Sequence, residues 1–335
     1  FTNIFGYHTT STFLTTRVSS GTTADGFAAS GTAASTFTTF TLDSQAAAPT
    51  VALLTDSGSS STDKITNVGT LSISGTESGA LVEYSATGSS GWSSTAPSLT
   101  QGSNTVYVRQ TDTAGNVSSS TAFTFTYDSQ AAAPTVALLT DSGSSSTDKI
   151  TNVGTLNVSG TESGALVEYS SNGTSGWSTT APALTQGSKT VYVRQTDVAG
   201  NVSASTSFTF TYDSQAAAPT VALATDSGTS GTDKITNVGT LSVTGTETGA
   251  LVEYSANGTS GWSSSAPSLS QGSNTVYVRQ TDGAGNISAS TAFSFTYDNQ
   301  AAAPTVALAT DSGTSGTDKI TNVGTLNVTG TESGA

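Results

Sequence analysis

The strongest constraint on the fold is an internal repeat. Asp43, Asp128, Asp213 and Asp298 each open a copy of the motif D(S/N)QAAAPTVAL, at a spacing of 85 residues. Segments 43–127 and 128–212 differ at only 11 of 85 positions. Self-similarity at a fixed period predicts an array of like structural units. We therefore expect a divergent partial β domain at 1–42, full repeats at 43–127, 128–212 and 213–297, and a truncated two-strand repeat at 298–335.

Each repeat contains short segments in which apolar and polar residues alternate. In the first repeat they are 48–54, 70–75, 80–85, 104–112 and 121–128, with weaker candidates around Trp92 and Leu99. Alternation with period two, interrupted by Gly, Ser, Asn and Pro, predicts antiparallel strands with one buried face. About seven such strands per repeat are typical of an immunoglobulin-like sandwich. The sequence thus predicts an all-β chain of tandem immunoglobulin-like β-sandwich domains, arranged head to tail.

The charge and the absence of thiols limit the partners of the chain. Nine basic and 23 acidic residues give a net charge of −14. Nucleic acids and anionic membranes are bound by clustered Lys or Arg, so we expect neither nucleic-acid binding nor direct membrane insertion. The chain contains no Cys, which excludes disulfides and thiolate zinc sites. An acidic, thiol-free surface fits an extracellular, oxidising environment.

The sequence does not support catalysis. Ser61 and Lys64 match the S-x-x-K pattern of serine acyltransferases, but Gly231 and Gly316 replace the serine in later repeats. His8 is the only histidine, so no Ser-His-Asp triad can recur with the repeats. We therefore expect no enzyme activity.

Four motifs of the first repeat carry a family resemblance. In the order D-x-Q-A-A-A-P-T-V-A-L, T-D-K-I-T-N, S-G-T-E-x-G-A and T-D-x-A-G-N-x-S, they resemble the bacterial immunoglobulin-like repeats of giant secreted adhesins and biofilm-associated surface proteins. The resemblance covers residues 43–335. It implies a structural spacer in an adhesin stalk, filament or surface layer at the bacterial cell surface. The implied partners are neighbouring domains of the same chain and other copies in a filament or layer.

An acidic segment recurs between the first two expected strands of each repeat. It reads TDSGSSSTDKITN from Thr55, and close copies begin at Thr140, Thr225 and Thr310. Because strands of a sandwich alternate in direction, this segment falls at the end where the chain leaves the domain. The turns that contain Glu77 and Asp112–Asn116 fall at the end where the chain enters. Head-to-tail stacking would therefore bring these acidic segments together at each joint.

Carboxylates gathered at one joint repel each other unless a cation neutralises them. Ca²⁺ suits such a site because it accepts six to eight oxygen ligands in irregular geometry. We therefore predict calcium-stiffened joints, while the alternative is that these Asp and Asn residues only form turns. The candidate ligands are Asp56, Asp63, Asn67, Asp128, Glu162, Asp197 and Asn201 at the first joint; Asp141, Asp148, Asn152, Asp213, Glu247, Asp282 and Asn286 at the second; and Asp226, Asp233, Asn237, Asp298 and Glu332 at the third.

Other functions remain open at this point. Trp92, Trp177 and Trp262 could form sugar-stacking platforms, although one Trp per small sandwich is more often part of core or edge packing. The threonine row of TAFTFTYD could offer an ice- or glycan-binding face, although its phenylalanines face the other way, as in any half-buried strand. The incomplete ends could also exchange strands between subunits and build a fibre, or the sequence is a window from a longer repetitive polymer.

Overall fold

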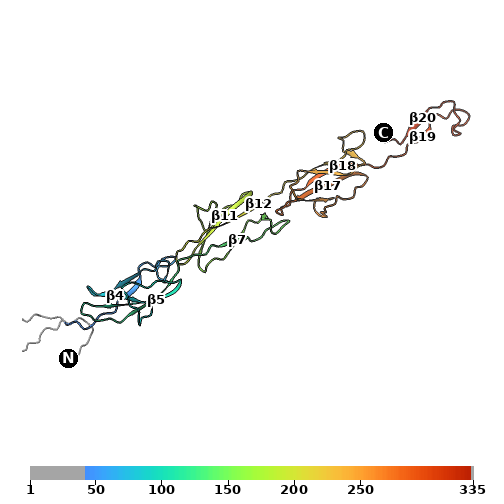
Figure 1. Cartoon of the computed structure of the whole chain (residues 1–335). Helices are drawn as coiled ribbons and strands as arrows, with labels where there is room; N and C mark the ends of the chain where they lie inside the picture. Colours follow the sequence, from blue (N-terminus) through green and yellow to red (C-terminus); the bar gives the residue numbers. More distant parts are fainter. Residues whose placement is uncertain (1–41, 333–335) are drawn as a thin grey trace, which may run out of the picture. The chain divides into compact units, whose positions relative to one another are not determined.

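The computed structural model describes residues 42–332 (Figure 1). All but one residue of the partial domain expected at 1–42, His8 among them, lie outside this range. Within it the regular elements are all β-strands and no helix is present, which confirms the predicted fold class. Consequently, no helix in the described part of the chain is long and apolar enough to cross a membrane.

The first repeat contains six strands in two sheets. They are β1 (Thr50–Leu53), β2 (Ile65–Thr66), β3 (Leu71–Ser74), β4 (Leu81–Ser85), β5 (Gly102–Thr111) and β6 (Thr121–Tyr127). β1 and β3 form an antiparallel pair, and the second sheet has the order β2-β6-β5-β4. β2 runs parallel to β6, whereas β4–β5 and β5–β6 are antiparallel.

Alternation along β5 and β6 builds the core between these sheets. Val106, Val108 and Phe125 are almost fully buried, and Val51 of β1 meets them from the other sheet. Gln110 occupies the next inward position of β5 and has no exposed surface. Such a small core leaves few contacts to spare, so the turns and the linker depend heavily on polar contacts.

The later repeats use the same elements. The second contains β7 (Thr135–Leu138), β8 (Ile150–Thr151), β9 (Leu156–Ser159), β10 (Leu166–Ser170), β11 (Gly187–Thr196) and β12 (Thr206–Tyr212). The third contains β13 (Thr220–Leu223), β14 (Ile235–Thr236), β15 (Leu241–Thr244), β16 (Leu251–Ser255), β17 (Gly272–Thr281) and β18 (Thr291–Tyr297). The fourth contains β19 (Thr305–Leu308) and β20 (Leu326–Thr329), which pair like β1 and β3.

Two details differ from the strands expected from the sequence. No strand forms around Trp92 or Leu99; Ser93 makes only an isolated bridge to Tyr84, because Ser and Gly dominate the chain around it. Conversely, Ile65–Thr66 forms the short strand β2, whose two residues are too few to show a periodic pattern.

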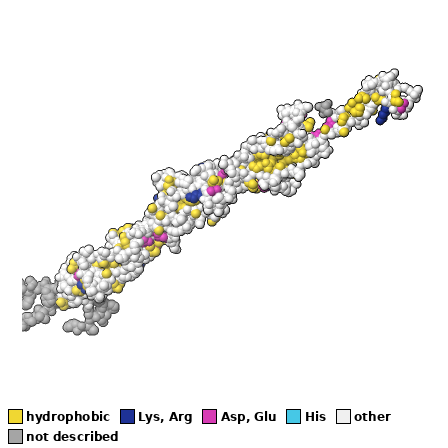
Figure 2. All heavy atoms as spheres, turned by 45° about the vertical axis from the view of Figure 1, so that its right-hand side comes forward, with side chains coloured by type: hydrophobic (Ala, Val, Ile, Leu, Met, Phe, Trp, Pro, Cys, Tyr) yellow, Lys and Arg dark blue, Asp and Glu magenta, His cyan; other side chains and the backbone are white. Residues whose placement is uncertain are grey.

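The described residues group into two compact units. One holds the first repeat with 160–167 and 194–204, and the other holds 134–159, 168–193 and 205–332. The turns at 160–167 and 194–204 of the second repeat thus belong with the first repeat. The visible surface is mostly white in Figure 2, meaning uncharged polar side chains and backbone, with few charged groups. On such a surface, charged groups that lie close together are candidates for a functional site.

Candidate metal centre

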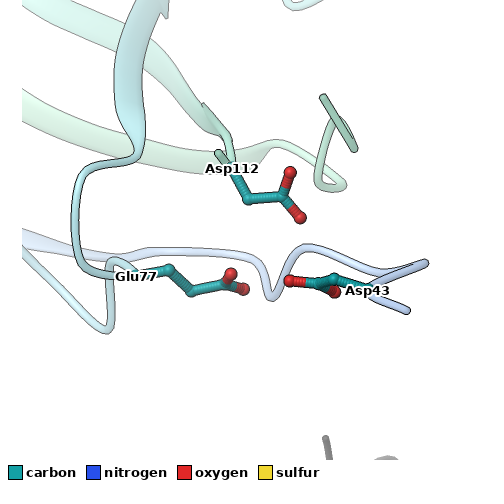
Figure 3. Close-up of side chains that lie close together, drawn as sticks. All are labelled: Asp43, Glu77 and Asp112. Atoms are coloured by element: carbon teal, nitrogen blue, oxygen red, sulfur yellow. The ribbon is translucent and has the colours of Figure 1, made fainter. Parts of the chain in front are cut away.

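Three carboxylates meet where the chain enters each full repeat, which we call the leading end. In the first repeat they belong to Asp43, Glu77 and Asp112, and one oxygen from each lies within 4.8 Å of the others (Figure 3). Asp43 lies on the linker before β1, Glu77 lies in the β3–β4 turn, and Asp112 follows β5. Equivalent clusters are formed by Asp128, Glu162 and Asp197 and by Asp213, Glu247 and Asp282.

The β5–β6 turn orients the carboxylate of Asp112 in the first cluster. Asp112 Oδ1 accepts from Asn116 N at 2.8 Å, and Oδ2 accepts from Asn116 Nδ2 at 2.7 Å. The side-chain bond from Asn116 is the main reason that the pKa of the Asp112 carboxyl lies below its ordinary value, although burial opposes it. Asp112 is therefore held as a carboxylate, the form that binds cations.

Glu77 and Asp43 bring the other two carboxylates to the site. Glu77 Oε1 accepts from Ala47 N at 3.1 Å, and Asp43 Oδ1 accepts from Gln45 N at 3.4 Å. Asn116 Nδ2 also donates to Asp43 O at 3.1 Å, which joins the linker to the β5–β6 turn. Within residues 42–332, no donor reaches Glu77 Oε2 or Asp43 Oδ2. Each cluster therefore keeps oxygens available for another ligand.

The second cluster shows how the linker belongs to two repeats at once. Asp128 Oδ1 accepts from Gln101 Nε2 of the first repeat at 2.9 Å, and Asp128 O accepts from Asn201 Nδ2 of the second at 2.8 Å. Glu162 Oε1 accepts from Ala132 N at 2.9 Å. These donors are neutral amides, so they orient the carboxylates without cancelling their charge. These carboxylate oxygens are suitable ligands for a hard cation.

The acidic segment 55–67 contributes to none of the three clusters. Asp56 Oδ2 accepts from Lys64 N at 2.9 Å, and Asp63 Oδ1 accepts from Ile65 N at 3.0 Å. Lys64 itself adopts a left-handed backbone conformation, with φ of 61°. The copies Asp141, Asp148, Asp226, Asp233, Asp311 and Asp318 make the same bonds. These loop carboxylates shape their own turn and belong to none of the three clusters, so their predicted grouping with the linker acids stays a prediction.

One atom of this segment remains unexplained by the turn. Asp56 Oδ1 is buried without a hydrogen-bond partner, and the same holds for Asp141, Asp226 and Asp311. Metal binding by the loop acids therefore stays a prediction, and Oδ1 is the oxygen through which it would occur.

The predicted asparagines do meet across the first two joints. Asn67 Nδ2 donates to Asn201 Oδ1 at 3.2 Å, and Asn152 Nδ2 donates to Asn286 Oδ1 at 3.1 Å. At the third joint, Glu332 Oε1 accepts from Ala302 N at 2.6 Å, and Asp298 Oδ1 accepts from Gln271 Nε2. Asn237 is exposed there, and the position equivalent to Asp282 lies beyond the sequence.

The model of a protein family described as "Bacterial Ig-like domain" matches the chain at residues 41–129, 130–214 and 215–299. The matches cover most of the chain. This chain belongs to the bacterial Ig-like domain family. The finding confirms the resemblance drawn from the repeated motifs. No curated protein matches the chain.

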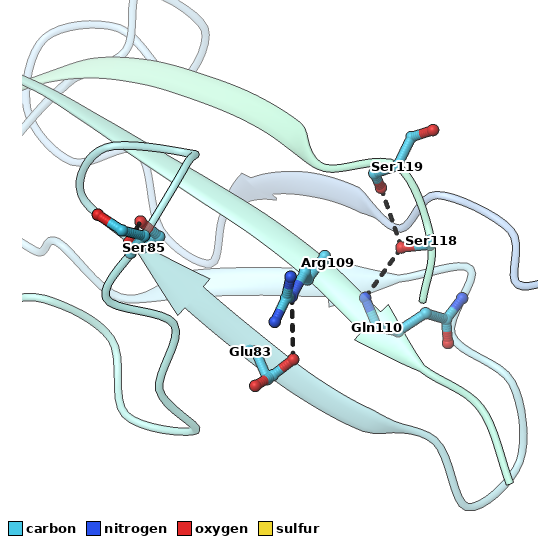
Figure 4. Close-up of polar contacts among 7 residues, drawn as sticks. Glu83, Ser85, Arg109, Gln110, Ser118 and Ser119 are labelled. Atoms are coloured by element: carbon cyan, nitrogen blue, oxygen red, sulfur yellow. Dashed lines mark hydrogen bonds and ion pairs between the residues drawn. The ribbon is translucent and has the colours of Figure 1, made fainter. Parts of the chain in front are cut away.

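Gln110 is a structural residue of the Ig-like repeat that the sequence reading missed. Its Oε1 accepts from Glu77 N at 2.8 Å, while Nε2 donates to Ala47 O at 2.6 Å. Ser118 Oγ accepts from the Gln110 backbone N–H, as Figure 4 shows. Gln195 and Gln280 are equally buried. The sequence did contain a signal for this role, because Gln110 is a polar residue at the inward-facing position that follows Val106 and Val108 in the alternation.

The tryptophan of the Ig-like repeat packs against an arginine. Arg109 Cζ lies 4.2 Å from the Trp92 ring centroid. Arg109 Nε donates to Glu83 Oε2 at 3.0 Å, as drawn in Figure 4. Trp262, Arg279 and Glu253 repeat the arrangement in the third repeat. One face of this ring is therefore covered by a guanidinium, which favours the packing interpretation over a sugar platform.

Proposed function

We propose that this chain is a structural spacer of an extracellular bacterial stalk, filament or surface layer, with calcium stiffening the joints between its domains. Membership of the bacterial Ig-like domain family supports the spacer role, because such domains usually occur in surface proteins. A net charge of −14 and the absence of Cys suit an exterior rich in divalent ions.

The observation that carries the calcium proposal is the position of the linker aspartate. Asp128 is bonded to Gln101 of the first repeat and shares a cluster with Glu162 and Asp197 of the second. A cation bound to all three carboxylates would hold the linker against the following repeat. Asp213, Glu247 and Asp282 would do the same at the next joint.

Calcium is preferred over other cations on the chemistry of the ligands. Carboxylate oxygens are hard ligands, which excludes metals that require thiolate or imidazole. Mg²⁺ demands near-ideal octahedral geometry, whereas Ca²⁺ tolerates ligands supplied by a linker and two separate turns. Water and backbone carbonyls would complete the coordination.

Small-angle scattering of the whole chain tests this proposal. We expect calcium to narrow the range of inter-repeat orientations, and excess chelator to reverse the change. The variant E162Q/E247Q removes two charges but still offers a side-chain oxygen, now of an amide, to accept from Ala132 N and from Ala217 N. It should lose the calcium response at two joints. Superimposable profiles of the wild-type chain with and without calcium would refute the calcium joint.

A further inference from the structure

The tip of the acidic segment, residues 57–59, touches the following repeat directly. Ser59 N donates to Val198 O at 3.0 Å, and Ser57 Oγ lies 2.9 Å from Ala199 O. Because a hydroxyl carries one proton, the Ser57 bond to Ala199 alternates with its bond to Asn67 Oδ1 at 2.8 Å. The backbone bond from Ser59 does not alternate. The next joint repeats these contacts, with Ser144 N donating to Gly283 O at 3.1 Å and Ser142 Oγ 2.9 Å from Ala284 O.

The centre of the tip can only be glycine. Gly58 has φ of 99°, and a Cβ built there would overlap Val198 O and lie 2.7 Å from Ala199 C. Gly143 is enclosed in the same way by Gly283 O and Ala284 C. At the third joint, where the sequence does not reach the matching turn, a Cβ on Gly228 would lie 3.8 Å from its nearest neighbour, Ile235 O. The close approach is thus a property of the joint and not of the isolated loop.

The turn of the following repeat that contacts the tip also requires small residues, at two positions. Ala199 and Ala284 are 0% and 1% exposed, whereas the equivalent Ala114 of the first repeat is exposed. A Cβ on Gly200 would lie 3.1 Å from Gly58 Cα. The position before the alanine is Thr113, Val198 or Gly283 in successive repeats, and at both joints only its carbonyl oxygen is used. The contact therefore requires an x-Ala-Gly-Asn turn, with x unrestricted.

The acids of the segment shape this tip. Asp56 and Asp63 bond the backbone of Lys64 and Ile65, and Asn67 N donates to Ser57 Oγ at 2.9 Å. Asn201 connects the contact to the acidic cluster, because it accepts from Asn67 and donates to Asp197 Oδ2 at 2.7 Å. No carboxylate takes part in the tip-to-turn bonds themselves.

We propose that the tip 57–59 is a docking element for the x-Ala-Gly-Asn turn of the next repeat and fixes the first joint without a metal ion, as the tip 142–144 does at the second. The inference rests on the spacer role of the proposed function and not on calcium. Docking and cation binding then restrain the same joint through different contacts. The partner is a backbone turn that offers two carbonyl oxygens as acceptors and has an alanine-glycine pair small enough to admit the tip.

Spin-label distance measurements on the whole chain in excess chelator test the inference. The chain has no Cys, so S94C and A204C label exposed sites on the first and second repeats only. The wild-type background should give one narrow distance peak. Gly58→Ala should abolish that peak. Gly228→Ala is the matched control, because Gly228 also has a left-handed backbone, with φ of 113°, but open space around it. It should leave the peak unchanged.

Ser57→Ala provides a second variant that does not strain the backbone, and it should broaden the peak less than Gly58→Ala. A broad distribution in the wild-type background under chelator would overturn the docking inference. So would a narrow peak that survives in Gly58→Ala. The calcium proposal is tested separately: it fails if adding calcium to the wild-type background leaves the distance distribution unchanged.

Discussion

Carboxylate groups serve different purposes in the two acidic regions at the first joint. In segment 55–67, Asp56 and Asp63 turn oxygens toward backbone N–H groups of their own loop. At the leading end, Asp128, Glu162 and Asp197 turn carboxylates toward one another. The first arrangement gives a turn its shape, and the second accumulates charge. Acidic composition alone therefore does not identify a metal centre; the partners of each oxygen do.

The largest expected effect comes from removing the cluster charges. In E77Q/E162Q/E247Q, thermal unfolding should no longer shift on adding calcium. A ligand at 100 times its Kd stabilises the folded state by about 2.7 kcal/mol per site, which corresponds to a shift of roughly 10–20 °C for a domain of this size. The control E83Q/E168Q/E253Q removes the same number of charges away from the clusters. A calcium shift that persists in the cluster variant would contradict the assignment.

The next effect concerns the residue that holds the linker to the leading end. Gln110→Leu leaves Glu77 N and Ala47 O without their partner, so we expect a loss of about 2–4 kcal/mol in unfolding free energy. Gln101 also bonds the linker but is exposed, and Gln101→Leu should cost less than about 1 kcal/mol. Urea unfolding of the first repeat measures both. Equal costs would mean that burial of Gln110 is not what matters.

A smaller effect is expected from the loop acids. Asp56→Ala removes the acceptor that holds Lys64 N, so the first repeat should lose about 1 kcal/mol of stability. Its calcium shift should stay as in the wild-type chain, because Asp56 belongs to no cluster. A reduced shift would show that the buried Oδ1 takes the cation, and the two acidic regions would then no longer be distinct.

The smallest effect is on acid stability. Hydrogen bonds from Asn116 lower the pKa of Asp112 below its ordinary value of 3.8. A depressed folded-state pKa gives stability that is present above 3.8 and is lost as the pH falls through the folded value. Asn116→Ala should therefore move the acid-unfolding midpoint of the first repeat to higher pH, as followed by tryptophan fluorescence. An unchanged midpoint would contradict this role of Asn116.

The sequence was sufficient for the fold because its signals were periodic. Alternation in 104–112 and 121–128 predicted β5 and β6, and the 85-residue period predicted the tandem array that the family match confirms. Strand β2 was missed because two residues carry no period. The weak segments around Trp92 and Leu99 were overpredicted, because a single bridge at Ser93 replaces a strand.

The candidate centre was less accessible from the sequence for a local reason. Alternating strand directions were enough to place Asp128, Glu162 and Asp197 at one end of the second repeat. They could not reveal that Asp56 is bonded to Lys64 N, because that bond depends on a lysine in the left-handed region, where glycine is the usual residue. The contact of Gly58 with Val198 O likewise depends on the exact approach of two loops.

Calorimetric calcium titration of three chains tests the central claim most directly. The wild-type chain, E77Q/E162Q/E247Q and D56A/D141A/D226A would each be stripped with chelator, dialysed and titrated. We predict that the wild-type and loop variants bind calcium alike and that the cluster variant does not. Calcium binding lost in the loop variant and kept in the cluster variant would contradict the claim, and so would an absence of binding in the wild-type chain.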